Sequence, residues 1–177
     1  MGAALTYIVD TLLSLALCVV LVRLLLQLTR ADFRNPLCQA VVRLTNPLIM
    51  PLRRVLPPVG KVDSASVVAV LLVATVKVAS LLALSDVSFA GMPLVWVRAV
   101  LTEILRTLLW TYFYAIVLYA VLSMIAPGGY SPLQSVLASL CEPVLRPIRR
   151  ISPPLAGLDL SPLWACILIQ AILILLH

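Results

Sequence analysis

Apolar segments long enough for transmembrane helices alternate along the chain with segments rich in proline and arginine. No charged side chain occurs in residues 11–22, 67–76 or 107–126. About 20 apolar residues of helix are needed to cross a bilayer core about 30 Å thick. The pattern therefore predicts four transmembrane helices, which we place near residues 5–28, 66–84, 104–125 and 162–177.

The composition supports an all-α integral membrane protein. Of the 177 residues, 63% are hydrophobic and only 11% are charged, which is about half the charged fraction of a soluble domain. A soluble globular protein is therefore excluded. Asp10 precedes every lysine and arginine, whereas a secretory signal peptide begins with basic residues. We therefore interpret residues 5–28 as a retained anchor.

The two halves of the chain share one pattern of prolines and charges. A shift of 96 residues, without a gap, places Pro36, Pro47, Pro51, Arg53, Arg54, Pro57, Pro58 and Asp63 on Pro132, Pro143, Pro147, Arg149, Arg150, Pro153, Pro154 and Asp159. Chance does not produce this register, so we predict two tandem repeats, residues 1–96 and 97–177. Because the first span falls on the third and the second on the fourth, the repeats are expected to be parallel.

The basic residues predict the orientation in the membrane. Nine of the 13 lysines and arginines lie in the two loops within the repeats, residues 29–65 and 126–161, whereas the loop at 85–103 holds only Arg98. By the positive-inside rule, the repeat loops face the cytoplasm and both termini face outward. Accordingly, Cys38 and Cys141 are expected to react with an impermeant thiol reagent only from the cytoplasmic side.

Each repeat loop is predicted to contain short amphipathic helices at the membrane interface. Asn35 and Ser131 each precede a proline, which is the pattern of an N-cap followed by the first helical position. Asn46 and Glu142 are expected to cap a second short helix, which later prolines limit in length. The Pro-Pro pairs predict an extended exit from each loop.

The boundaries of the second and fourth spans also carry candidate caps. Ser64 and Ser161 are expected to cap these helices, and Asp63 and Asp159 add negative charge at the positive ends of the helix dipoles. For both aspartates we favour this structural role.

The loop arginines are the first candidate binding residues. They are Arg53, Arg54, Arg149 and Arg150, together with Arg43 and Arg146. An arginine at the membrane surface contributes about 1 kcal/mol of attraction to anionic lipid. A doubled cationic site for lipid headgroups or an acidic partner is one interpretation, and ordinary topogenic charge is the other.

Charges inside the predicted spans are the second set of candidates. Lys77 lies deep in the second span, where its charge must snorkel, pair or line a cavity. Asp10 can pair with Lys77, or with Arg106, which occupies the position equivalent to Asp10 in the other repeat. Arg23, near the inner end of the first span, is expected to snorkel. A role for Lys77 in ion conduction stands beside these structural interpretations.

The chain lacks the usual signatures of an enzyme or of a cofactor site. Its one histidine is the terminal His177, and no carboxylate pair with a nucleophile, phosphate-binding glycine loop or metal-ligand spacing is present. The four cysteines are expected to be packing residues or free thiols. We expect a protein that is not an enzyme and that has no metal, cofactor or nucleic-acid partner.

Three sequence runs carry a resemblance to a known family. Ala31-Asp-Phe-Arg-Asn-Pro, Asn46-Pro-Leu-Ile-Met-Pro-Leu-Arg-Arg-Val-Leu-Pro-Pro and Val62-Asp-Ser-Ala-Ser, with the second copy from Glu142 to Pro162, resemble the YggT family of bacterial inner-membrane proteins. The resemblance implies a non-enzymatic protein connected with osmotic-stress tolerance and potassium balance. Relatives called YlmG are linked to cell division beside SepF, and plastid relatives to nucleoid distribution and cytochrome assembly. The resemblance supplies no active site.

Two functional hypotheses follow. The leading one is a membrane scaffold that docks anionic lipid headgroups, or a cytoplasmic division or envelope protein, on its proline and arginine loops. The alternative is an oligomeric channel or transporter component for potassium or another ion, with Lys77, Asp10 and Arg106 in its polar path. Since four spans per chain make a poor internal pore, the alternative requires a homo-oligomer.

Overall fold

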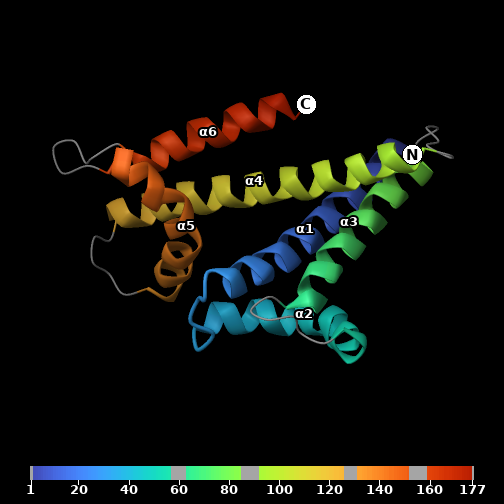
Figure 1. The fold of residues 1–177 in the computed structure, drawn as a ribbon, viewed down its shortest axis with the longest axis horizontal. Helices are drawn as coiled ribbons and strands as arrows, with labels where there is room; N and C mark the ends of the chain where they lie inside the picture. The colour runs from blue at the N-terminus through green and yellow to red at the C-terminus, as the bar shows by residue number, and fades with distance from the viewer. Residues whose placement is uncertain (1, 57–62, 85–91, 126–130, 152–158, 177) are drawn as a thin grey trace.

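In the computed structural model, which describes residues 2–56, 63–84, 92–125, 131–151 and 159–176, these parts of the chain form six α-helices (Figure 1). The helices are α1 (Gly2–Leu28), α2 (Pro36–Val55), α3 (Ser64–Leu84), α4 (Pro93–Ile125), α5 (Pro132–Ile151) and α6 (Ser161–Leu175). Within the described residues, α1, α3 and α4 are long and apolar enough to cross a membrane, whereas α6 is a shorter apolar helix of 15 residues. The fold is therefore all-helical and compatible with a membrane protein.

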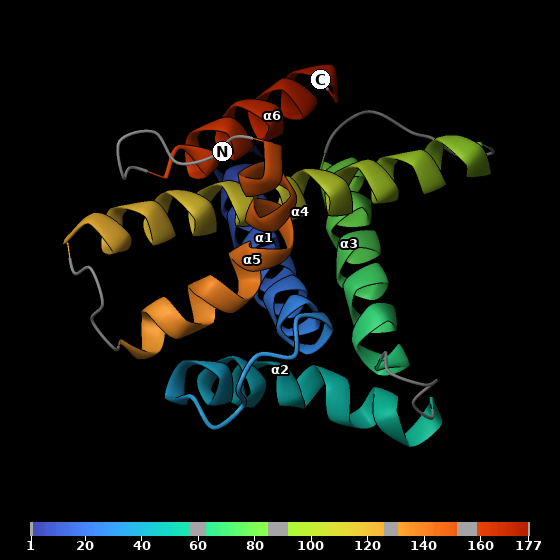
Figure 2. The same ribbon diagram turned by 60° about the vertical axis from the view of Figure 1, so that its left-hand side comes forward.

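The helices pack in two similar sets. In the first, α2 lies across the end of the antiparallel pair α1 and α3, and in the second, α5 packs against α4 and α6 (Figures 1 and 2). Contacts between the sets join α1 to α4 and α5, α3 to α4, and α2 to α5. Helices α1 and α3 are the more enclosed of the long helices, and α4 has much of its surface open.

The core consists of three apolar clusters. In the first set, small residues such as Ala65, Ala69 and Ala74 on α3 are completely buried and let α1 approach closely. In the second set, Ile116 of α4 and Leu145 of α5 are likewise completely buried. A third cluster joins the two sets through α1, α2, α4 and α5.

Helix α4 is longer than expected. We predicted a span at 104–125 after an outer loop at 85–103, but the helix begins at Pro93 and continues for 33 residues. Proline is suited to the first helical position, and the residues that follow are mostly apolar. The prediction set the start of this helix from the number of residues needed to cross a bilayer. A helix can extend beyond that length wherever its backbone hydrogen bonds and side-chain packing favour it.

Helices α2 and α5 correct the prediction of two short helices in each loop. Each is one helix of 20 residues with two prolines inside it, Pro47 and Pro51 in α2 and Pro143 and Pro147 in α5. Each proline removes one backbone donor, but the two in each helix are one turn apart and exposed, so the carbonyls that lose a partner lie toward one exposed side.

The expected start of α2 is confirmed, and its expected exit is untested. Asn35 is the N-cap, with its Oδ1 accepting a 2.9 Å hydrogen bond from the backbone N–H of Leu37, and Pro36 follows at the first position. The Pro-Pro pairs of the two loops lie outside the described residues; these are Pro57, Pro58, Pro153 and Pro154.

Candidate functional site

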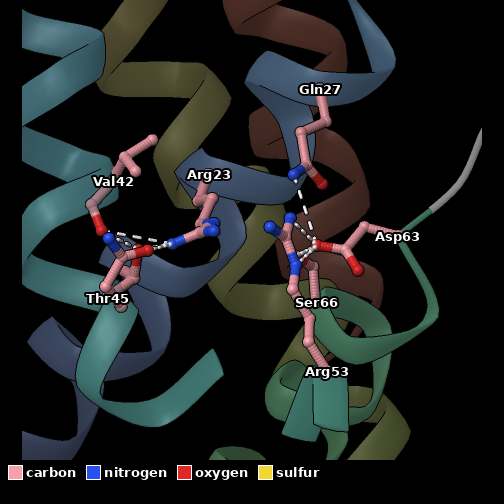
Figure 3. A network of polar contacts seen from close by, with 8 residues as sticks. Arg23, Gln27, Val42, Thr45, Arg53, Asp63 and Ser66 are labelled. Atoms are coloured by element: carbon pink, nitrogen blue, oxygen red, sulfur yellow. Dashed lines mark hydrogen bonds and ion pairs between the residues drawn. The ribbon is translucent and has the colours of Figure 1, made fainter. Parts of the chain in front are cut away.

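Asp63 connects the three helices of the first set (Figure 3). Its Oδ2 accepts hydrogen bonds from Arg53 Nη2 at 2.5 Å, from Ser66 Oγ at 2.8 Å and from Gln27 Nε2 at 3.4 Å. Its backbone carbonyl accepts from the N–H of Ser66 at 2.9 Å. Asp63 is therefore the residue that caps α3, and Ser64, the cap we predicted, is instead the first residue of the helix.

The second set repeats this ion pair 96 residues later. Arg149 Nε donates to Asp159 Oδ2 at 2.9 Å, and Arg149 Nη1 donates to Glu142 Oε2 at 3.1 Å. Asp159 Oδ1 also accepts from the backbone N–H of Ser161 at the start of α6. Both arginines therefore act as internal links, Arg53 between α2 and α3 and Arg149 between α5 and α6, although the sequence grouped them with the surface-binding arginines.

These contacts change the acidity of the linked groups. Burial alone would raise the pKa of Asp63, but the hydrogen bonds from Arg53, Ser66 and Gln27 and the charge of Arg53 outweigh it and hold that pKa below its ordinary value. The pKa of Asp159 is lowered in the same way, with burial opposing the hydrogen bonds from Ser161 and Arg149. Both carboxylates are therefore charged at neutral pH.

Arg23 does not snorkel as expected. Its side chain turns inward and is 2% exposed, because α2 crosses the end of α1 and supplies hydrogen-bond acceptors there. Its Nη1 donates to Thr45 Oγ1 at 2.6 Å, to Asn46 Oδ1 at 2.9 Å and to the carbonyl of Val42 at 3.2 Å (Figure 3). Asn46 thus binds Arg23 within α2 instead of capping a second helix, as we had predicted.

Besides Arg53, whose side chain is 49% exposed although it is paired with Asp63, four arginines of α2 and α5 are exposed. They are Arg43, Arg54, Arg146 and Arg150, and we call them the arginine belt. Cys38 and Ile49 mark the buried face of α2. At 100° per residue, Arg43 and Arg54 lie about 140° and 160° around the helix from Cys38. In α5 the belt arginines likewise lie away from the face that packs on α4 and α6. The belt is therefore available to ligands.

Lys77 gathers the polar residues of the opposite end of the bundle. Its side chain is 6% exposed, and its Nζ donates to Ser14 Oγ at 2.7 Å and contacts Asp10 Oδ1 at 3.1 Å and Glu103 Oε1. The predicted pairing of Lys77 with Asp10 is therefore present. We call Asp10, Ser14, Lys77 and Glu103 the Lys77 cluster. The sequence reasoning missed Glu103 because it assigned residue 103 to a loop, although the continuing apolar pattern could have placed it on the helix.

The Lys77 cluster opens into a groove of about 710 Å³ between α1, α3 and α4, in which charged and hydroxyl side chains lie beside apolar ones such as Leu15 and Leu81. Besides the cluster, its lining includes Cys18, Arg106, Thr107, Trp110, Thr111 and Tyr114. The two carboxylates and two cations of the groove balance in charge, and hydroxyls continue the polar lining along α4. Asp10 and Arg106 line the same groove, and their direct pairing stays a prediction. Such a groove can hold water or a small polar ligand.

The native cysteines do not suit the topology test that the sequence suggested. Cys38 and Cys141 are both completely buried. Burial raises the pKa of Cys141 to about 12 and, together with the negative charge of Asp32, raises the pKa of Cys38. Since the thiolate is the reactive form, the expected labelling from the cytoplasmic side is wrong for the folded protein.

We therefore predict that an impermeant maleimide will leave Cys38 and Cys141 unmodified on either side of the membrane until the protein is denatured. The exposed Gln39→Cys variant, in a Cys18→Ala and Cys166→Ala background, should be modified on one side only. Mass spectrometry of protein from inside-out and right-side-out vesicles measures both. Rapid modification of Cys38 in the folded protein would contradict the buried position.

Among the described residues no group of His, Cys, Asp and Glu could hold a metal ion.

Comparison with known proteins places this chain in a family. The family model described as CCB3/YggT matches residues 2–84 and 98–177, two segments whose first residues are 96 positions apart. The chain belongs to the CCB3/YggT family. This YggT-family chain matches no solved structure.

Several curated relatives match this YggT-family chain over nearly its full length. It is 40% identical to an uncharacterized protein of Pseudomonas aeruginosa over 97% of the chain and 87% of the relative. It is 36% identical to the uncharacterized protein YggT of Escherichia coli K12 over 95% of the chain and 86% of the relative. A Vibrio alginolyticus protein from the proC 3′ region is 34% identical over 90% of the chain and 86% of the relative.

Proposed function

We propose that this YggT-family protein is a bacterial inner-membrane scaffold that binds anionic lipid headgroups through the arginine belt. In this proposal the chain crosses the membrane four times as two parallel halves, with α2 and α5 as amphipathic helices at the cytoplasmic surface. By holding lipid at two places on one rigid body, the protein contributes to envelope organisation or osmotic-stress tolerance. It acts without catalysis, cofactor or metal.

Corresponding positions support the two-half organisation. Helices α2 and α5 begin at residues 36 and 132 and end at residues 55 and 151, so both ends differ by 96. The ion pair of Arg53 with Asp63 and that of Arg149 with Asp159 differ by 96 at both partners. The fourth crossing is assigned to α6, whose 15 residues extend about 22 Å. A helix this short requires local thinning of the bilayer.

The observation that carries the proposal is that two of the loop arginines are paired with carboxylates of the protein whereas the belt arginines are not among the ion pairs of the described residues. Arg53 and Arg149 are bound to carboxylates of the protein itself. The belt arginines lie on exposed surface, away from the faces of α2 and α5 that pack on the long helices. Arginine binds phosphate bidentately, and a basic residue at an anionic membrane surface is worth about 1 kcal/mol. Four together supply enough energy to select anionic lipid.

We predict that replacing all four belt arginines by glutamine lowers the preference for phosphatidylglycerol over phosphatidylcholine several hundred-fold, as four contributions of about 1 kcal/mol imply. Arg54→Gln alone should lower it about five-fold. The exposed Arg98→Gln variant, at the far end of α4, is the matched control and should change nothing. Native mass spectrometry of lipid adducts on the purified protein measures the preference. An unchanged preference in the fourfold variant would reject the proposal.

A second candidate function is passage of a small ion, and the charged and hydroxyl groups in the groove beside Lys77 favour it. Its lining of charges and hydroxyls lies between helices that cross the membrane. Rubidium flux into proteoliposomes tests this candidate, with the belt variant as a control that should conduct normally. Absence of flux through the well-folded wild-type protein would exclude it.

A further inference from the structure

The contact between the two halves of the chain is not symmetric. From the first half it uses α1, α2 and α3, and from the second half it uses α4 and α5, at positions that are not the equivalents of those in the first half. One apolar part of the contact includes Val22, Leu25, Leu26 and Cys38 on one side and Leu108, Tyr112, Val136 and Leu140 on the other. Because the contact joins unlike surfaces, each half has one face that lies in the contact and another face, equivalent to the partner's contact surface, that does not.

The unused faces can be identified by the shift of 96 residues. Leu25 is 8% exposed at the contact, whereas its equivalent in the second half, Val121, is 45% exposed. Leu118, the equivalent of Val22, is exposed as well. In the first half, Leu12 is equivalent to Leu108 and is exposed. Each of the two surfaces that meet in the contact therefore has an equivalent in the other half of the chain, and that equivalent is exposed.

The polar contacts between the halves give the same result. The Cys18 Sγ and Thr111 Oγ1 atoms lie 3.5 Å apart, and their equivalents are the exposed residues Tyr114 and Leu15. Asn35 Nδ2 donates to the carbonyl of Pro132 at 2.7 Å. Its equivalent is Ser131, and that of Pro132 is Pro36.

The equivalents of this bond are available for the same contact. Ser131 and Pro36 are both exposed. A serine hydroxyl can donate to a carbonyl as the asparagine amide does. Positions that are covered by the contact in one half and exposed in the other thus occur from the middle of the long helices to the surface helices.

Lipid contact alone does not explain this pattern. Positions that face lipid in both halves should be exposed in both, and α3 and α6 have such positions. Leu71 and its equivalent Ile167 are exposed, as are Val76 and its equivalent Ile172. By contrast, the faces described above are covered in one half and open in the other.

We propose that a second copy of the chain covers these faces in a head-to-tail contact. The open face of the second half consists of Tyr114, Leu118 and Val121 on α4 with Ser131 before α5. It packs on the open face of the first half of the next copy, which consists of Leu12 and Leu15 on α1 with Pro36 and Leu44 on α2. The contact repeats between chains the one already present within the chain. A contact between unlike faces gives a ring when the rotation between copies closes and an open chain of copies when it does not, and we propose the closed ring. This inference rests on the two-half organisation proposed above but not on lipid binding.

Cysteine cross-linking tests the contact at one pair of positions. Leu15 and Tyr114 line the same groove within one chain, so the two substitutions are placed on separate chains. In membranes from cells that produce both variants, each with its native cysteines replaced by alanine, Leu15→Cys on one chain and Tyr114→Cys on the other should form links between chains through a short bifunctional thiosulfonate. Each substitution alone should form few links between chains. Leu71→Cys with Ile167→Cys, which lie on lipid-facing surface, is the matched control and should form none. Thr111→Cys beside the native Cys18 should link within one chain and shows that the reagent reaches the bundle.

Failure of the Leu15→Cys and Tyr114→Cys pair to link, while the pair of Cys18 with Thr111→Cys links, would overturn the proposal. Efficient linking of Leu15→Cys to itself would overturn it as well, because it indicates a symmetric contact. Photobleaching of single labelled wild-type molecules provides a test without these variants. Two or more steps per spot are expected, and single steps would reject the ring. If the single-step protein still selects phosphatidylglycerol, the lipid proposal stands without it.

Discussion

Replacement of Lys77 by leucine is expected to lower the free energy of unfolding by about 3 kcal/mol. Breaking a buried ion pair costs about 3–5 kcal/mol because the remaining charge stays buried without a partner. The Glu103 side chain is only 17% exposed, so the loss of Lys77 leaves its carboxylate poorly solvated. The Asp10 side chain is 45% exposed and can be solvated by water when Lys77 is lost. The expected loss of stability therefore lies at the lower end of the range of about 3–5 kcal/mol.

Titration of the purified protein with SDS in mixed micelles measures this change. The double variant Lys77→Leu and Glu103→Gln should recover most of the loss, because the glutamine is neutral. Arg98→Leu, which removes an exposed cation from α4, should stay within about 0.5 kcal/mol of the wild type. If Lys77→Leu were as stable as the wild type, the Lys77 cluster would contribute nothing to holding α1, α3 and α4 together.

Replacement of Asp63 by asparagine is expected to cost about 2 kcal/mol, and replacement of Asp159 by asparagine about 1 kcal/mol. Hydrogen bonds to a charged group contribute about 1.5–3 kcal/mol each when buried and less when exposed. The side chain of Asp63 is 11% exposed and that of Asp159 is 41% exposed. The equivalent aspartates therefore serve as controls for each other, and equal losses in the same SDS titration would contradict this account.

The same two aspartates predict how stability depends on pH. Their pKa values are lowered in the folded protein, so folding is favoured by their contribution above the ordinary value of 3.8. As the pH falls below about 4 toward the lowered pKa values, the unfolded state binds protons first and the contribution is lost. Between pH 6 and pH 3, the free energy of unfolding should fall less in the Asp63→Asn variant than in the wild type. A wild-type dependence retained in full by Asp63→Asn and Asp159→Asn would assign the effect to other groups.

The sequence predicted the parts of the structure that depend on local pattern. The long apolar runs predicted α1 and α3 within a few residues, because a helix in a bilayer must satisfy its own backbone groups. Asn35 with Pro36 predicted the start of α2 for an equally local reason. The spacing of charges also suggested that Lys77 meets Asp10, since both lie toward the same end of antiparallel spans.

The sequence by itself therefore determined the apolar segments that form α1 and α3, the start of α2 and the positions that correspond between the two halves. Only the tertiary structure decided what each charge does. Arg23 is buried because α2 crosses the end of α1, and Glu103 joins Lys77 because α4 packs on α3. The same packing brings Asp63 to Arg53 and not to Arg54 beside it, although both arginines are exposed. The partner of a charged side chain depends on helices brought together from distant parts of the chain, and local pattern carries no information about that contact.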